Sequence, residues 1–274
     1  MSFVQISDTH FIQGGGELYE TNPALRLRDG VAMINEDYKS LDFVLATGDL
    51  AHYGEKDAYI RLKAELDELE IPCYLMMGNH DSRAPFREIF PDMPAMEGGF
   101  YQYALESGNM RILCLDSLND VPGDHIGRLC EARLRWLDEE LRKTPLDKKL
   151  VIANHHPPFD LGLPAMDAIK LRDSEALWEV LSNRKPDLML FGHVHRPISG
   201  AWKGIPFHIQ RGFNHQVALS FEEDLSIPFC EEYPDIAIVK NVGDSLIVYT
   251  RSVGGELRHF PSGAENKQPE FSIP

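Results

Sequence analysis

The stretch Cys-Tyr-Leu-Met-Met-Gly-Asn-His-Asp, residues 73–81, shows the pattern that decides the fold. Its first five residues form an apolar run too short for a helix, which predicts a buried strand at Cys73–Met77. The glycine suits a sharp exit from that strand, and the polar residues Asn79, His80 and Asp81 follow at its carboxyl end. One polar segment of this kind after a strand is usually an ordinary turn. Only its repetition along the chain indicates a functional site.

The pattern recurs along the chain. Further apolar runs predict strands at Phe3–Ser7, Phe43–Thr47, Arg111–Asp116, Leu150–Asn154 and Leu188–Phe191. Most of them lead into polar segments, which are Ser7-Asp8-Thr9-His10, Gly48-Asp49, Asn154-His155-His156 and Gly192-His193-Val194-His195. In an open α/β sheet, ligands bind at the carboxyl ends of the strands. We therefore expect these segments to converge on one site.

Helical patterns lie between several of the predicted strands. Apolar residues recur every three to four positions in Ala24–Tyr38, Glu55–Glu70, Arg128–Lys143 and Ser174–Asn183. Strands that alternate with helices indicate parallel β-α-β units with both sheet faces covered.

The last quarter of the chain lacks a helical period. It predicts a second, antiparallel set of strands at Phe207–Arg211, Val217–Phe221, Ile236–Lys240 and Leu246–Arg251. Three long segments are predicted to be loops that cover the site or form contacts: Arg83–Phe100, Pro157–Arg172 and Glu222–Pro234. We expect a single domain over residues 1–254, followed by a polar tail at 255–274.

Composition restricts the partners and the compartment. The chain of 274 residues has a formal net charge of −16, which argues against nucleic-acid polymers and anionic membranes as partners because both bind basic surfaces. No apolar stretch approaches the roughly 18 residues that a membrane span needs. With no signal peptide at the start and four scattered cysteines, we expect a cytoplasmic protein.

The polar segments offer carboxylate, amide and imidazole groups, without sulfur. That set suits two hard-to-borderline divalent ions such as Mn²⁺, Fe²⁺ or Zn²⁺. Asp8 and His10 lie two residues apart, and His193 and His195 repeat that spacing. Because alternate side chains of an extended segment share a face, each pair is expected to reach one ion.

The order of these motifs resembles that of the calcineurin-like metallophosphoesterases. It reads Asp-x-His at 8–10, Gly-Asp-x4-Gly at 48–54, Gly-Asn-His-Asp at 78–81, His-His-Pro-Pro at 155–158 and Gly-His-x-His at 192–195. The resemblance covers residues 4 to 196 and implies an α/β fold. That fold is a four-layer α-β-β-α sandwich, in which two mixed sheets are flanked by helices.

The resemblance also implies how the ligands are shared. One ion would be held by Asp8, His10, Asp49 and His195, and the other by Asp49, Asn79, His155 and His193. Asp49 would bridge the two ions, which a carboxylate with two oxygens can do. Four protein ligands for each ion leave positions open for substrate, as in a catalytic rather than a structural site.

His80 would not be a ligand in this scheme. The resemblance makes it a stabiliser of the charged transition state, or a proton donor to the leaving oxygen. Asp81 would either fix the tautomer of His80 or cap the loop by accepting hydrogen bonds from nearby amides. His156 could be a ligand or a neighbour that orients the ligands, and it ranks below His155 as a ligand.

Three further segments resemble the bacterial branch of class III cyclic-nucleotide phosphodiesterases and glycerophosphodiesterases: Leu18-Tyr19, Ala165-Met166-Asp167 and Asn214-His215-Gln216-Val217. The resemblance places His215 near the substrate phosphate, whereas alone it would be a satisfied loop or core histidine. Tyr19 would line the pocket mouth or simply pack. Relatives in this branch assemble, so a homodimer or higher homo-oligomer is expected.

These features together predict a dinuclear-metal phosphodiesterase. We expect it to cleave a 3′,5′-cyclic nucleotide or a glycerophosphodiester by in-line attack of a metal-bridging hydroxide, with substrate contacts from Asn79, His80, His215 and Tyr19. The motifs contain no arginine cluster, which favours a singly charged diester over a monoester. The alternatives are a phosphomonoesterase or phosphonate-ester hydrolase on the same site, and a non-catalytic metal-binding scaffold.

Overall fold

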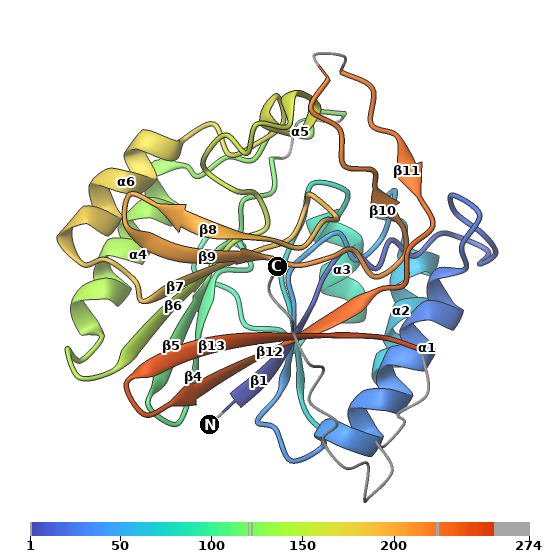
Figure 1. Ribbon diagram of the computed structural model, residues 1–274, viewed down its shortest axis with the longest axis horizontal. Coiled ribbons are helices and arrows are strands. Elements are labelled where there is room, and N and C mark those ends of the chain that lie inside the picture. Colours follow the sequence, from blue (N-terminus) through green and yellow to red (C-terminus); the bar gives the residue numbers. More distant parts are fainter. Residues whose placement is uncertain (1, 120, 122, 223–224, 255–274) are drawn as a thin grey trace, which may run out of the picture.

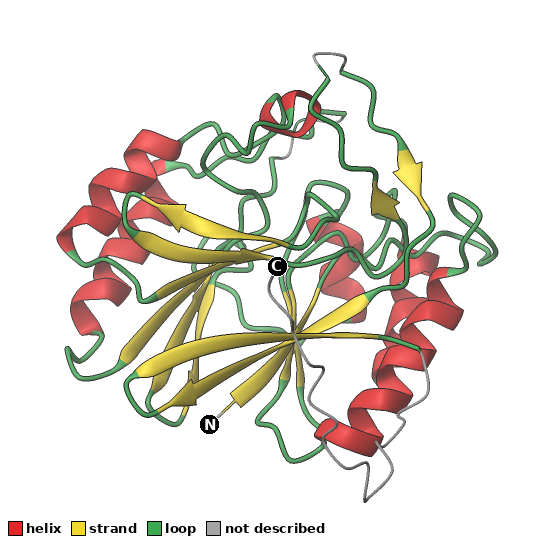
Figure 2. Cartoon of the chain, viewed as in Figure 1, coloured by secondary structure: helices red, strands yellow, loops and turns green. Residues whose placement is uncertain are grey.

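The computed structural model describes residues 2–119, 121, 123–222 and 225–254. Its strands form two large sheets that lie face to face, and helices cover both outer sides (Figure 1 and Figure 2). No helix in the described part of the chain is long and apolar enough to cross a membrane. The single domain at 1–254 stays a prediction, and the tail at 255–274 lies outside the described residues.

The first sheet has five strands in the order β13-β12-β1-β2-β3. Its parallel strands are β1 (Ser2–Ile6), β2 (Val44–Ala46) and β3 (Cys73–Leu75). Two strands extend it in antiparallel pairing beside β1, namely β12 (Asp235–Val242) and β13 (Ser245–Ser252). The helices on its outer side are α1 (Pro23–Met33), which runs into a π-helical turn (Ile34–Tyr38), α2 (Lys56–Leu66) and α3 (Arg83–Ile89).

The second sheet has six strands in the order β4-β5-β6-β7-β9-β8. Its parallel strands are β5 (Met110–Cys114), β6 (Lys149–Ala153), β7 (Leu188–Phe191) and β9 (Ile205–Ile209). Its antiparallel edges are β4 (Tyr103–Ser107) and β8 (Ile198–Trp202). The helices beside it are α4 (Glu131–Lys143), α5 (Pro164–Asp167) and α6 (Ser174–Asn183). A separate small hairpin pairs β10 (Gln216–Val217) with β11 (Phe229–Cys230).

Successive side chains of a strand point alternately to the helices and to the other sheet, which gives the layered arrangement. In β2, Val44 packs toward the helices of the first sheet, whereas Leu45 lies in the core between the sheets. In β6, Ile152 packs toward α4 and α6, and Val151 faces the other sheet. Because successive strand residues point to opposite faces, both faces of each sheet are apolar and buried. The expected four-layer α-β-β-α sandwich is confirmed.

The prediction for the last quarter of the chain was wrong in one respect. Its strands do not come together in one sheet, because β9 pairs with β7 and β12 pairs with β1, while β10 and β11 pair with each other. Each sheet thereby gains strands at an edge whose backbone groups would otherwise lack partners. The segments predicted as loops also contain structure, namely α3, α5 and β11.

Candidate metal centre

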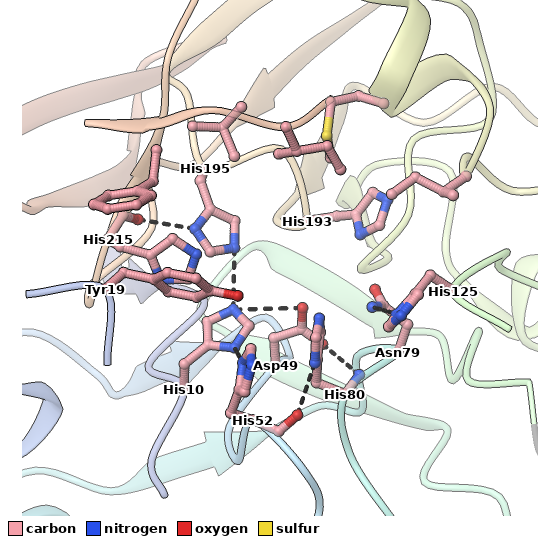
Figure 3. Close-up of a pocket in the computed structure, with 15 residues that line it drawn as sticks. His10, Tyr19, Asp49, His52, Asn79, His80, His125, His193, His195 and His215 are labelled. Carbon is pink, nitrogen blue, oxygen red and sulfur yellow. Dashed lines mark hydrogen bonds and ion pairs between the residues drawn. The ribbon is translucent and has the colours of Figure 1, made fainter. Parts of the chain in front are cut away.

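The predicted ligands lie just after the carboxyl ends of strands of both sheets. Figure 3 shows His10, Asp49, Asn79, His193 and His195 among them. The first sheet supplies Asp8, His10, Asp49 and Asn79, which follow β1, β2 and β3. The second sheet supplies His155, His193 and His195, which follow β6 and β7. All of them are buried except Asn79, which is half-buried. The cluster therefore belongs to both sheets at once.

The backbone is left-handed at most of these ligands. The φ angle is 57° at Asp8, 47° at His10, 51° at Asp49, 70° at His193 and 54° at His195. Such angles cost residues other than glycine roughly 1–3 kcal/mol each and persist only where surrounding contacts impose them. The expectation that each Asp-x-His or His-x-His pair lies on an extended segment was therefore wrong.

Two glycines allow the close approach of the loops. Gly48 has a φ angle of 103°, and a Cβ atom there would lie 2.5 Å from Nδ1 of His155. At Gly78 a Cβ atom would lie 2.2 Å from Oδ1 of Asp49. A side chain at either position would displace a predicted ligand, which explains the glycine that precedes Asp49 and Asn79.

The first ligand set is assembled in the structure. One potential ligand atom from each of its residues lies within 4.8 Å of the others; these residues are Asp8, His10, Asp49 and His195. Nε2 of His10 lies 3.0 Å from Nε2 of His195 and 3.6 Å from Oδ2 of Asp49. Nδ1 of His195 donates to the carbonyl of His215 at 2.8 Å, so its Nε2 presents a lone pair when the ring is neutral. Such converging lone pairs are the arrangement that a cation stabilises.

The second set is assembled in part, around His155. Nδ1 of His155 donates to the carbonyl of Thr47 at 2.8 Å, so its Nε2 faces Oδ1 of Asn79 at 3.2 Å and Oδ2 of Asp49 at 3.3 Å. The His193 ring lies 5.2 Å from that of His155, measured between centroids.

Two buried atoms of the cluster lack a hydrogen-bond partner among the described residues, namely Nε2 of His193 and Oδ2 of Asp8. Buried polar atoms are nearly always paired. These two unpaired atoms and the converging lone pairs are suited to bind two divalent ions.

The electrostatics agree with this assignment. Burial lowers the pKa of His155, but the Asp49 carboxylate outweighs it and raises that pKa to about 9. Burial likewise opposes ionisation of Asp49, yet His155 and His80 bring its pKa well below the usual range. Burial also holds the pKa values of His10 and His193 well below the usual range, so both rings are neutral. Positive charge is thus stabilised beside Asp49, and neutral imidazoles are the form that binds metal.

His80 lies next to the ligands without belonging to either set. Its Nδ1 donates to the carbonyl of His52 at 2.7 Å, and its backbone amide donates to Oδ1 of Asp49 at 2.9 Å. With Nδ1 engaged in this way, Nε2 is the ring atom left to meet a substrate in the pocket that His80 lines.

Asp81 does not orient His80, and that expectation is corrected. Its carboxylate accepts hydrogen bonds from four groups: the amides of Leu50, Ala51 and Gly78 and the hydroxyl of Tyr59. Burial and the nearby Asp49 raise the pKa of Asp81 to about 6. Asp81 therefore caps the loop that carries Asp49, which is the alternative that the sequence left open.

His215 and Tyr19 both reach the cluster. The His215 ring lies 4.3 Å from that of His195, and Tyr19 lies 4.5 Å from His215, measured between ring centroids. Burial and the adjacent His195 lower the pKa of His215 to about 2, so the ring is neutral. Both residues line the pocket, and Tyr19 is 41% exposed.

The cluster opens into a pocket of about 240 Å³ (Figure 3). The rest of its wall is apolar and consists of Met166, Ile169, Val217, Ile227 and Phe229. Among the described residues that line it, there is no lysine or arginine. A wider groove continues past His80 and shares Tyr19, His52 and Asn79 with the pocket.

The sequence reasoning missed two histidines. Nδ1 of His52 lies 3.0 Å from Nδ1 of His10, and Nδ1 of His125 lies 2.9 Å from Nδ2 of Asn79. His52 lies inside the Gly-Asp-x4-Gly motif, where its presence was a usable signal, whereas His125 lies in a loop without any motif. His156 lies with His155 and His193 in a group that could hold a metal ion, but its ring nitrogens already face the hydroxyl of Ser117 and the carbonyl of His125.

Comparison with known proteins identifies the family of this chain. Residues 1–197 match the model of the calcineurin-like phosphoesterases, and the chain belongs to that family. It is 46% identical over 250 residues to a probable cyclic nucleotide phosphodiesterase of Rhodopseudomonas palustris, covering 91% of each chain. A probable glycerophosphodiester phosphodiesterase of Arcobacter nitrofigilis is 32% identical over 242 residues, covering 87% of this chain and 88% of the relative.

A solved structure shares the fold. The dimetal phosphatase of Danio rerio superimposes with a TM-score of 0.70 at 18% identity, covering 93% of this chain and 97% of that one. This similarity agrees with the fold, and the resemblance inferred from the motifs is confirmed by the family model and the relatives.

Proposed function

We propose that this protein is a metal-dependent phosphodiesterase that acts on small phosphodiesters, either 3′,5′-cyclic nucleotides or glycerophosphodiesters. The observation that carries the proposal is a pocket with a histidine and aspartate cluster on its floor, an apolar wall and no basic side chain among its described lining residues. A strongly cationic pocket would favour a doubly charged monoester, so this one suits the singly charged diester better. The relatives in Rhodopseudomonas palustris and Arcobacter nitrofigilis support the same choice through their names.

The two ligand sets would hold two divalent ions, with Mn²⁺, Fe²⁺ and Zn²⁺ as the candidates. When bound, such ions polarise phosphoryl oxygens and activate the attacking water. The chain's own residues position the remaining groups. Asp49 belongs to both sets, and His80 meets the substrate through Nε2, where it stabilises negative charge or, when doubly protonated, delivers a proton to the leaving oxygen. Asn79, His215 and Tyr19 complete the substrate contacts.

Hydrolysis of bis(p-nitrophenyl) phosphate tests the proposal. The purified protein should turn over this diester with added Mn²⁺, lose activity on chelation and recover it on re-addition. His80→Ala should lower kcat by about 10²–10⁴-fold while metal content stays unchanged, since His80 is not a ligand. A metal-loaded protein that is inert toward diesters, monoesters and phosphonate esters would instead be a binding scaffold.

The route of the reaction is also part of the proposal. In-line attack by hydroxide, without a covalent enzyme intermediate, puts one solvent oxygen into the product. Hydrolysis in ¹⁸O-labelled water should therefore label the phosphate monoester product, and a covalent phosphoryl-enzyme trapped during turnover would contradict this route.

A kinetic panel separates the substrate classes. Cyclic AMP, glycerophosphocholine, glycerophosphoethanolamine and a phosphate monoester should be compared by kcat/KM on one metal-loaded preparation. We expect a diester to be preferred. A clear monoester preference would overturn the diesterase assignment while leaving the metal centre intact.

Assembly and location complete the proposal. We infer a homodimer or higher homo-oligomer acting in the cytoplasm on a small substrate, without nucleic-acid or membrane partners. The net charge of −16 supports the exclusion of anionic polymers and anionic membranes. Sedimentation equilibrium would reveal the oligomeric state, and a monomer at micromolar concentration would contradict this part.

A further inference from the structure

His52 occupies a position that none of the metal motifs assigns. It is only 6% exposed and lies in the loop after β2, three residues beyond Asp49. Its ring stacks on that of His80, with 4.6 Å between centroids and 18° between planes (Figure 3). Its Nδ1 lies 3.0 Å from Nδ1 of His10, and its backbone carbonyl accepts the Nδ1 proton of His80 at 2.7 Å. One residue thus contacts both a predicted metal ligand and the predicted substrate-facing histidine.

The tautomer of His10 determines whether His52 donates or accepts the hydrogen bond between them. His10 directs Nε2 toward Asp49 and His195, so Nε2 is its metal-binding atom. A neutral ring that binds metal through Nε2 carries its hydrogen on Nδ1. The atom that faces this hydrogen is Nδ1 of His52, which must then be the acceptor. Metal-binding histidines almost always donate their other ring N–H to a carboxylate, carbonyl or water, and here a second imidazole takes that place.

The ring and the backbone of His52 have separable roles. Its amide donates to the carbonyl of Phe11 at 2.8 Å and its carbonyl accepts from His80, so both backbone contacts survive a side-chain substitution. The contact with His10 depends on the side chain alone. A variant of His52 therefore tests the acceptor without removing the backbone anchor of His80.

We propose that His52 is a positioning residue: its side chain accepts the Nδ1 proton of His10 and fixes the imidazole that binds the first ion. This role of His52 rests on the proposed function only because it requires that the first ion binds. His52 itself touches neither metal nor reacting atoms in this scheme. Without this acceptor the His10 ring can rotate. The affinity for the first ion then falls, and the affinity for the second ion does not.

Two matched variants separate an acceptor from a packing ring. His52→Asn keeps an oxygen near the position of Nδ1 but removes the ring, whereas His52→Phe keeps a flat ring but removes the acceptor. The full-length protein should be titrated with Zn²⁺ in competition with a chromophoric chelator. We expect His52→Phe to weaken the first ion by about 10–100-fold and His52→Asn to stay within a fewfold of the parent protein.

His125→Phe is the comparison variant, because its ring faces Asn79 of the second ligand set. It should leave the affinity for the first ion unchanged. Circular dichroism shows that each variant is folded before its titration is interpreted.

The inference is overturned if His52→Phe binds both ions as tightly as the parent, or if His52→Asn loses as much affinity as His52→Phe. The second result would mean that packing of the His52 ring, rather than its acceptor atom, sets the affinity for the first ion. These affinities need no substrate, so they stand even if the parent protein fails to hydrolyse diesters. Conversely, an active enzyme with unaffected variants would refute this inference and leave the proposed function in place.

Discussion

The strained backbone of the ligands is held by contacts between the loops that carry them. The amide of Asp8 donates to the carbonyl of Gly48 at 3.0 Å, and the amide of His10 donates to the carbonyl of Asp49 at 3.0 Å. The carbonyl of Asp8 accepts from the amides of Phe213 and Asn214. Left-handed residues with such cross-links are over-determined by their surroundings, which is the condition under which strain persists at a functional site.

Asp49 is the residue whose loss should do the most damage, because it belongs to both ligand sets. Asp49→Asn should lower kcat/KM by about 10³-fold, which corresponds to several kcal/mol of lost transition-state stabilisation. Elemental analysis should show that both ions are depleted. The surface variant Asp67→Asn, whose carboxylate pairs only with Lys63 among the described residues, is the control and should keep full activity. Depletion of a single ion would show that Asp49 does not bridge.

The residue types of this site could be predicted from the sequence, but their contacts could not. Ligand chemistry and spacing predict Asp8, His10 and His195 as candidate ligands, because each motif is local. The partners of His10 and Asp81 are not local: His52 lies 42 positions from His10, and Tyr59 lies 22 positions from Asp81. Such contacts appear only when the loops have been brought together by the sheets.

At the scale of elements, the β10–β11 hairpin forms part of the pocket wall. Ile227 and Phe229 line the pocket from this hairpin, and Phe229 lies 5.3 Å from Tyr19 between ring centroids. Arg196, which directly follows the ligand His195, donates to the carbonyl of Val217 at 3.1 Å and to Glu232 at 2.7 Å. The hairpin is therefore bonded to the loop that carries a predicted metal ligand.

This arrangement predicts that the hairpin contributes to substrate binding rather than to chemistry. Phe229→Ala should raise KM for the preferred diester by about tenfold, the size of one lost aromatic contact, with kcat and metal content nearly unchanged. Leu225→Ala is the matched control, because Leu225 is 69% exposed and does not line the pocket. A drop in kcat with unchanged KM would mean that the hairpin acts on the reacting groups instead.

Asp116 joins three elements and should matter for stability rather than activity. It is fully buried, and its carboxylate accepts from the guanidinium of Arg83 at 2.8 and 2.7 Å and from the amide of Tyr101 at 2.9 Å. Its carbonyl accepts from Arg133 at 2.6 Å. Asp116→Asn should lower the free energy of unfolding by about 3–5 kcal/mol, because it leaves buried cationic groups without their carboxylate.

Urea denaturation measures this effect, and Asp67→Asn again serves as the surface comparison. An unchanged urea midpoint in Asp116→Asn would contradict a structural role for the carboxylate.

The elements that were predicted are those with strong patterns. The central strands are continuous apolar runs because both of their faces are buried, and α4 and α6 carry clear apolar stripes. The edge strand β8 reads Ile-Ser-Gly-Ala-Trp and is largely exposed, so its sequence lacks a strand pattern. Helix α3 spans seven residues and contains a proline, so no helical period could be recognised. These elements depend on their neighbours more than on their own residues.

At the scale of the whole molecule, the candidate metal centre connects the two halves of the sandwich. Asp8, His10 and Asp49 come from the first sheet, and His155, His193 and His195 come from the second. Elsewhere the sheets are joined by the apolar core between them, which includes Phe3, Leu45 and Val151. At the site the contact is polar and contains orphaned atoms, so without ions it is the weak part of that interface.

Metal removal should therefore lower the thermal stability as well as the activity. An ion that binds the folded state alone and is present at 100 times its dissociation constant stabilises that state by about 2.7 kcal/mol. Two such ions in a chain of this size would raise Tm by on the order of 10 °C. Differential scanning calorimetry of chelated and reloaded protein measures the shift, and Asp49→Asn should show little of it because its ions are already lost. Complete metal removal without a fall in Tm would mean that the ions do not link the two sheets, and the cluster would then have to be held by the protein alone.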